Sequence, residues 1–129
     1  MALVFILGTK SSERLSMPKS PIDLLLHMLD ELNFLIEKSD KISEEEFQRN
    51  DLYQRAFVRS LEVIGEASKS IPQEFKTRHS SLPWKEMARM RDRLIHHYFG
   101  IDYQLVWDTV SNDIPNLYQQ INEILENEM

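Results

Sequence analysis

Apolar side chains recur at helical spacing in four long segments of this sequence. These segments cover residues 21 to 38, 51 to 70, 83 to 98 and 103 to 125. Within each segment the apolar positions lie three or four residues apart, so that a helix would have one face to bury. Four such helices joined by short connections predict an all-α fold, an up-and-down four-helix bundle with short extra helical turns.

Capping residues mark the ends of the shorter and earlier elements. Ser20 followed by Pro21 predicts an N-cap with proline at the first helical position. Ser43, with Glu46 three residues later, predicts a capping box that starts a short helical turn. A second short turn is expected at residues 73 to 78, in the connector that follows the second long helix.

Glycine and proline residues constrain the other three helices. Gly65 in a helix interior costs roughly 1 kcal/mol relative to alanine, so we expect another helix to approach closely there. Pro83 should open the third helix, and Gly100 is placed to end it as a left-handed C′ residue. Asp102 should cap the last helix, in which Pro115 predicts a kink.

Length and composition favour one soluble domain. A chain of 129 residues is large enough for one core, and its apolar fraction of 42% and charged fraction of 28% are ordinary for a folded protein. The absence of cysteine excludes disulfides and thiolate chemistry, and it fits a cytoplasmic protein. We expect a helical domain over residues 17–129. Residues 1–16 are expected to be an N-terminal extension, or a segment that packs at an edge, and not a targeting or membrane segment.

One arginine breaks the apolar pattern of the third helix. If residues 83 to 98 form one helix, Arg91 occupies a position of its apolar stripe. Burial of a guanidinium group is unfavourable unless it is paired or presented to an anionic ligand. Glu62 and Glu66 in the second helix are the nearest candidates for its carboxylate partner. The other members of the stripe are Trp84, Met87, Ala88, Leu94, Ile95 and Tyr98.

The basic residues of the chain are concentrated around this arginine. Residues 69 to 97 hold seven Lys and Arg against three Asp and Glu, a balance of +4. The whole chain has a formal net charge of −6, so the remainder carries −10. A local positive field on an acidic body suits a small anionic site better than a long phosphate-neutralising surface.

Arg91, Asp92 and His96 provide the parts of a phosphodiester-cleaving site. His96 would be the general base or acid in an internal attack by a ribose 2′-hydroxyl, and Arg91 would stabilise the charge on the phosphorus oxygens. Asp92, four residues before His96, could orient its imidazole. On one helix, however, Arg91 and His96 point about 140° apart. They converge only if Arg91 reaches across or the helix ends early.

Simpler interpretations of the same residues remain open. Arg91 could be a buried structural ion pair, His97 could be a histidine favoured by a helix C-terminus, and Tyr98 could be a core tyrosine. His79, His96 and His97 could be metal ligands, but His96 and His97 would diverge by about 100° on a helix and no carboxylate completes a known ligand spacing. We therefore expect no metal and no cofactor.

The segment from Arg91 to Tyr98 fits the pattern R-x4-H-x-Y, which resembles the signature of HepT-like toxins in the HEPN superfamily. The resemblance covers about residues 19 to 126, and Asp92 stands where asparagine is common. Its other matching features are Gly65-Glu66-Ala67, Pro83-Trp84, Met90, Phe99-Gly100-Ile101-Asp102 and Val106-Trp107.

The resemblance implies a helical homodimer that acts as a metal-independent endoribonuclease on an RNA substrate. Arg91 and His96 would be catalytic and could come together across a dimer cleft, with Asp92, Glu66 and Arg93 in support. It further implies a toxin-antitoxin pair in which an MNT-type nucleotidyltransferase antitoxin transfers AMP to Tyr98. Two alternatives are a non-catalytic module that docks such a nucleotidyltransferase, and a plain dimeric bundle in which Arg91 is structural.

Overall fold

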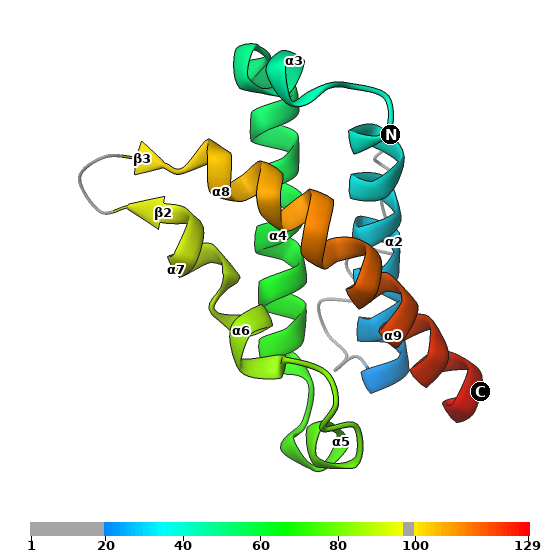
Figure 1. The fold of residues 1–129 in the computed structure, drawn as a ribbon. Helices are drawn as coiled ribbons and strands as arrows, with labels where there is room; N and C mark the ends of the chain where they lie inside the picture. The colour runs from blue at the N-terminus through cyan, green and yellow to red at the C-terminus, as the bar shows by residue number, and fades with distance from the viewer. Residues whose placement is uncertain (1–19, 97–99) are drawn as a thin grey trace, which may run out of the picture.

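The protein is an all-α bundle, as predicted, with one minimal hairpin (Figure 1). Its structure, a computed structural model, describes residues 20–96 and 100–129. The helices are α2 (Pro21–Ser39), α3 (Glu44–Arg49), α4 (Asp51–Ser70), α5 (Gln73–Arg78), α6 (Trp84–Ala88), α7 (Met90–Leu94), α8 (Tyr103–Asp108), the π-helical turn η1 (Thr109–Asp113) and α9 (Ile114–Glu128). The strands β2 (Ile95–His96) and β3 (Gly100–Ile101) pair antiparallel.

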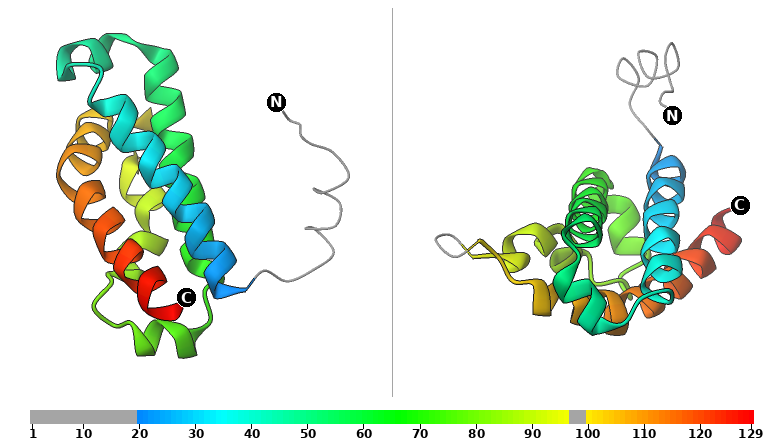
Figure 2. Two further views of the ribbon diagram at one scale, coloured as in Figure 1. Left: turned by 90° about the vertical axis from the view of Figure 1, so that its right-hand side faces the viewer. Right: turned by 90° about the horizontal axis from the view of Figure 1, so that it is seen from above.

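The helices follow the predicted up-and-down course. Helices α2 and α4 lie side by side, α6 and α7 pack on α4, and α9 crosses α2 (Figure 2). Their facing sides form one core, in which the largest fully buried side chains are Phe47, Phe57, Leu25, Met28, Leu32, Leu35, Leu61, Ile64, Met87, Leu94, Ile114 and Ile121. No helix within the two described ranges combines the length and the apolar character needed to cross a bilayer.

The capping predictions for the first half of the chain are confirmed. The Ser20 side chain accepts a hydrogen bond from the backbone N–H of Asp23, and Pro21 occupies the first helical turn. Ser43 and Glu46 exchange both hydrogen bonds of a capping box at the start of α3. These contacts satisfy N–H groups that a helix start otherwise leaves unpaired, which is why the boundaries could be set from local sequence.

Gly65 lies where another helix comes close, as expected. A Cβ atom at this position would stand 3.1 Å from the carbonyl oxygen of Met87, the residue next to the end of α6. Only a glycine leaves room for this backbone approach without displacement, which offsets its low helix propensity. The glycine therefore fixes where α6 rests on α4.

The prediction of one continuous third helix is wrong. The helix is interrupted at Arg89, whose backbone has φ −93° and ψ 5°, and it then ends at Leu94 instead of near residue 99. After the interruption the buried residues are Met90 and Leu94, so Arg91 turns to solvent. The interruption thus keeps the core apolar and the guanidinium group hydrated, which removes the cost of burying a cation.

A short hairpin follows α7 in place of the expected last helical turn. Ile95 pairs with Ile101 and His96 with Gly100. Gly100 has the predicted positive φ, 77°, but it serves the hairpin and not a helix C-terminus. The backbone N–H of Asp102 then donates to the Leu94 carbonyl over 2.8 Å, which closes the base of the hairpin.

The last helical segment is irregular immediately before Pro115, as the proline predicted. Asp102 caps α8 through a hydrogen bond from the Leu105 N–H, which confirms its predicted role. The π-helical turn η1 then separates α8 from α9, with the Ile114 N–H donating to the Thr109 carbonyl. Pro115 follows this turn at the start of α9, and because proline has no backbone N–H it cannot donate to a carbonyl of the preceding turn.

Candidate functional site

Arg91 is held by a single carboxylate on the surface of α4. Its Nε donates to Oε2 of Glu62 over 2.9 Å. The Arg91 side chain is 55% exposed and that of Glu62 is 25% exposed. Within the described ranges the guanidinium group has no other hydrogen-bond partner, so its two terminal nitrogens are available to an anion.

The arginine is therefore not a buried structural ion pair, the alternative that its place on the apolar stripe left open. An exposed pair of this kind contributes about 0 to 1 kcal/mol to stability. Because only Nε bonds to Glu62, the two terminal nitrogens of the Arg91 guanidinium group remain free to bind a phosphate or carboxylate with two parallel hydrogen bonds.

Glu66, the carboxylate that we expected to support the site, has a different neighbour. It lies 3.4 Å from Nζ of Lys69, and its side chain is 64% exposed. The signal that favours Glu62 lies in the sequence itself. Glu62 is three residues before Gly65 and shares the face of α4 that receives α6 and α7, whereas Glu66 is turned by about 100° from that glycine.

His96 follows Arg91 on a different element. Because α7 ends at Leu94, His96 belongs to β2, and the 140° separation expected on one helix does not apply. The helix ends early, which was one of the two ways in which Arg91 and His96 could converge. Asp92 is exposed on α7 and is no longer one helical turn before His96. The side chain of His96 and all of His97, Tyr98 and Phe99 lie outside the described residues.

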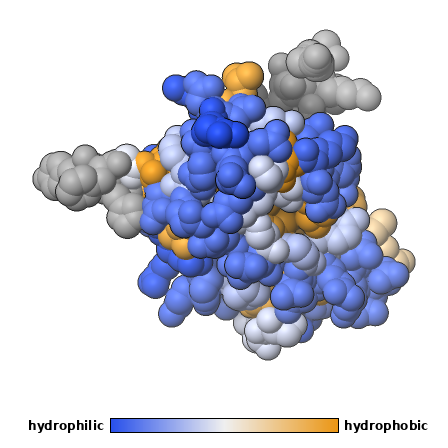
Figure 3. All heavy atoms as spheres, turned by 45° about the horizontal axis from the view of Figure 1, so that its top comes forward, coloured by the Kyte–Doolittle hydropathy of each residue, from blue (hydrophilic) through white to orange (hydrophobic). Residues whose placement is uncertain are grey.

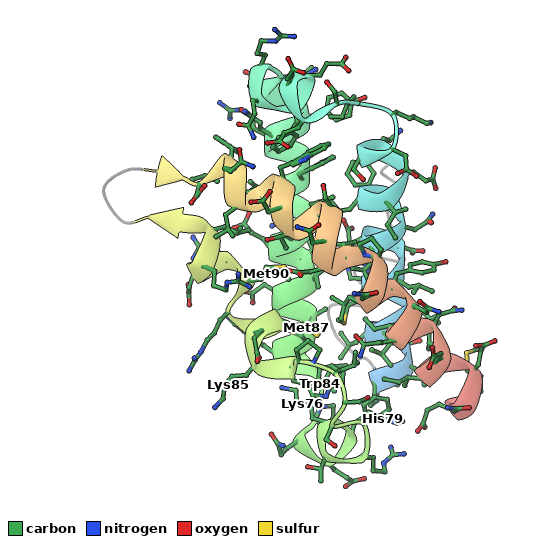
Figure 4. The ribbon with its side chains drawn as sticks, viewed as in Figure 1. Lys76, His79, Trp84, Lys85, Met87 and Met90 are labelled. Carbon is green, nitrogen blue, oxygen red and sulfur yellow. The ribbon has the colours of Figure 1, made fainter. Side chains whose placement is uncertain are left out.

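Arg93 borders a small apolar hollow between the motif and the last helix. The hollow has a volume of about 290 Å³, and the buried side chains of Met87, Met90 and Leu117 line it. Figure 4 shows Met87 and Met90 directed from α6 and α7 toward α4. The other residues that line this hollow are Pro83, Glu86, Asp113, Asn116 and Gln120.

A second ionic cluster joins α5 to the end of α9. Glu128 Oε2 lies 2.9 Å from Arg78 Nη1 and 2.8 Å from His79 Nε2. The hydrogen bond with His79, followed by the charge of Arg78, lowers the pKa of Glu128 below its ordinary value. The Trp84 indole N–H donates to the His79 carbonyl over 2.9 Å. This cluster fixes α5 and the start of α6.

A comparison with known families identifies this arrangement of helices and motif. The model of the family described as "Ribonuclease HepT-like" matches residues 28–124, about three quarters of the chain. The chain belongs to the HepT-like ribonuclease family. The family resemblance seen in R-x4-H-x-Y is thereby confirmed, and the enzyme class, ribonuclease, is confirmed with it.

Individual relatives of this HepT-like chain carry ribonuclease names. It is 52% identical over 110 residues to "Putative RNase TTE0752" of Caldanaerobacter subterraneus subsp. tengcongensis, covering 85% of this chain and 98% of that protein. It is 46% identical over 101 residues to "Probable ribonuclease HepT" of Thermococcus cleftensis, covering 78% of this chain and 92% of that protein. No solved structure matches the chain.

Proposed function

We propose that this HepT-like chain is the toxin of a type II toxin-antitoxin pair and acts in the cytoplasm as a metal-independent endoribonuclease. The observation that carries the proposal is the presentation of Arg91. Its guanidinium group is exposed and is held in place by an ion pair with Glu62. Arg91 lies five residues before the motif histidine, His96, in a chain that belongs to a ribonuclease family.

The proposed reaction is cleavage by the ribose 2′-hydroxyl. His96 removes the proton of that hydroxyl, the 2′-oxygen bonds to the adjacent phosphorus, and the 5′-oxygen leaves with a proton from a second acid group. Arg91 stabilises the extra negative charge on the non-bridging oxygens as the transition state forms. The products are a 2′,3′-cyclic phosphate and a 5′-hydroxyl end.

We place the working site in a homodimer cleft to which two R-x4-H motifs contribute. A second copy would supply the acid group that one motif lacks, because a single histidine cannot both remove the first proton and hold the second one in the same step. Asp92, Glu66 and Arg93 would support the two catalytic residues in this cleft.

We further propose that an MNT-type nucleotidyltransferase neutralises the toxin at Tyr98. The phenolic oxygen of Tyr98 would attack the α-phosphorus of ATP, release pyrophosphate and lose its proton. The AMP group then adds bulk and negative charge beside Arg91, which repels the RNA phosphate. The alternative function is a non-catalytic module that docks the nucleotidyltransferase without cleaving RNA.

The deciding experiment is an RNA cleavage assay with purified protein in a chelating buffer. The wild type is expected to produce cyclic-phosphate ends and the His96→Ala variant is expected to produce none. Equal cleavage by both would refute the proposal. Complex formation with the nucleotidyltransferase but no cleavage by the wild type would favour the docking module. Mass spectrometry of the protein coexpressed with its genomic neighbour checks for AMP on Tyr98.

A further inference from the structure

A broad hollow lies between α5 and α6, ahead of the motif in the chain. It has a volume of about 740 Å³ and is lined by α5, α6 and the connector between them. Lys76 of α5 and Lys85 of α6 both line it, and Figure 4 shows the two side chains at this end of the molecule. The other lining residues are Gln73, Thr77, Ser80, Ser81, Leu82, Pro83, Trp84, Glu86 and Ala88.

Within the described ranges Lys76 and Lys85, like Arg89 and Arg93, have no ion-pair partner. Lys69, Arg78 and Arg91 each pair with a glutamate. In the part of the chain that the structure describes, no carboxylate lies within 4.0 Å of the amino groups of Lys76 and Lys85. Their charge is therefore not neutralised locally, although the protein as a whole is acidic.

Neutral donors complete the lining. Within the described ranges the hydroxyl groups of Ser80 and Ser81 have no hydrogen-bond partner, whereas that of Thr77 donates to the Gln73 carbonyl. The hollow contains one carboxylate, that of Glu86, which also borders the smaller hollow next to Arg93. Two free cations and two free hydroxyl groups against one acid form a surface for an anion that also accepts hydrogen bonds.

The shape of the hollow is fixed by the core beneath it. Trp84 is 8% exposed and its indole N–H is bonded to the His79 carbonyl, while Phe75 and Leu82 are each 3% exposed. The hollow is therefore formed before a ligand binds. Binding would need to order only the side chains of Lys76 and Lys85, which keeps its entropic cost low.

We propose that this hollow binds backbone phosphates of the RNA substrate at positions outside the cleaved bond. The inference rests on the proposed ribonuclease function, because it extends the RNA path from the motif. Lys85 lies on α6, six residues before Arg91 on α7, so six residues of chain, at most roughly 20 Å, separate them. A span of that size covers no more than about six nucleotides of a stacked strand. The lysines neutralise phosphates without reading the bases, so this contact adds affinity and not sequence preference.

RNA fits the hollow better than an acidic segment of a partner protein does. The free lysines and hydroxyl groups lie on the same stretch of chain as Arg91, which the proposed reaction places on a phosphate. A long single strand bound at Arg91 would continue onto a neighbouring positive surface. Figure 3 shows a different face, with the top of Figure 1 turned forward, and this face is mostly hydrophilic with separate apolar patches.

The test compares the binding of a labelled 12-nucleotide 2′-O-methyl RNA to the full chain and to its variants. The methyl group blocks the attacking hydroxyl, so the probe stays intact and binding is measured apart from cleavage. The double variant Lys76→Gln/Lys85→Gln is expected to bind roughly tenfold more weakly at low salt. Its slope of log affinity against log salt should be smaller by about 1.4, or 0.7 for each lost phosphate contact.

Lys41→Gln/Arg49→Gln removes the same charge from two exposed positions near α3 and should bind the probe as the wild type does. Equal affinity and salt slope in the Lys76/Lys85 variant and the wild type would overturn the inference, as would an equal loss in the control. Loss of nucleotidyltransferase binding with unchanged RNA binding would assign the hollow to a protein partner and overturn it too.

The same variants separate this inference from the proposed function. If the wild type cleaves RNA and both double variants bind the probe as tightly as the wild type does, the proposal for the hollow is refuted and the ribonuclease proposal stands. A wild type that binds the probe through Lys76 and Lys85 but cleaves no RNA refutes the ribonuclease proposal alone. If the wild type does not bind the probe, the hollow does not bind RNA.

Discussion

Arg91 and Glu62 form an ion pair that crosses from α7 to α4, with Nε and Oε2 2.9 Å apart. Glu62 is the less exposed of the two, because it lies on the side of α4 that receives α6 and α7. The less exposed carboxylate therefore supports a side chain that is more than half exposed. It orients the guanidinium group through Nε and leaves the other two nitrogens for a ligand.

Glu62→Gln should reduce RNA cleavage more than it reduces stability. The amide keeps the shape of Glu62 but loses its charge, so Arg91 is held less firmly. We expect cleavage to fall by roughly tenfold, since small displacements of a catalytic group are strongly felt. The free energy of unfolding should change by about 1 kcal/mol or less, measured by urea denaturation. Glu123→Gln, on the exposed side of α9, is the matched control and should change neither quantity.

Arg91→Met separates a catalytic role from a structural one. Because the side chain is more than half exposed, the melting temperature should stay within a few degrees of the wild type. Cleavage should fall by roughly 100-fold or more, since the charge that stabilises the phosphorus oxygens is lost. Unaltered cleavage with unaltered stability would mean that Arg91 has no part in the reaction.

Gly65→Val should destabilise the protein by separating α6 from α4. The backbone oxygen of Met87 already lies 3.1 Å from the site of a Cβ, so a branched side chain forces the two helices apart. We expect a loss of about 1 to 3 kcal/mol in the free energy of unfolding. Arg55→Val, at an exposed position of the same helix, introduces the same side chain without the contact and should cost less. An equal loss in both variants would show that helix propensity alone is responsible.

The Glu128 cluster should make stability depend on pH in the acid range. The His79 hydrogen bond lowers the pKa of Glu128 below its ordinary value of 4.5 in the folded protein. The stabilisation is therefore complete above that ordinary value and is lost as pH falls through the lowered one.

Glu128→Gln removes this titration. The wild type should be more stable than the variant at pH 5, and this difference in unfolding free energy should become smaller as the pH falls to about 3. Urea denaturation at each pH measures it. Glu126→Gln, exposed on the same helix, supplies the comparison. A difference that stays constant or grows as the pH falls through this range would contradict the prediction.

Local sequence was sufficient to place the helix ends that are capped by side chains nearby in the chain. Ser20 with Pro21, the Ser43 and Glu46 capping box, and Asp102 each complete their hydrogen bonds within three residues, so the sequence alone placed these boundaries. The R-x4-H-x-Y motif was likewise readable without a structure, because the family signature is a matter of residue type and spacing.

The interruption at Arg89 could not be read from spacing, because it depends on what packs beneath the helix. A regular helix over residues 83 to 98 satisfies the apolar period, yet it would press Arg91 into the core against α4. The chain instead breaks where Met87 rests on Gly65 and resumes with Met90 and Leu94 buried. The cost of one helix interruption is smaller than that of a buried, unpaired cation.

The sequence by itself determined the helices with their caps, the motif and the presence of two candidate acids for Arg91. The tertiary structure decided which acid holds the arginine and that its guanidinium group faces water. The reason is geometric: both acids lie within three residues of Gly65, and the packing of α6 and α7 on one side of α4 brings Arg91 to Glu62 and not to Glu66.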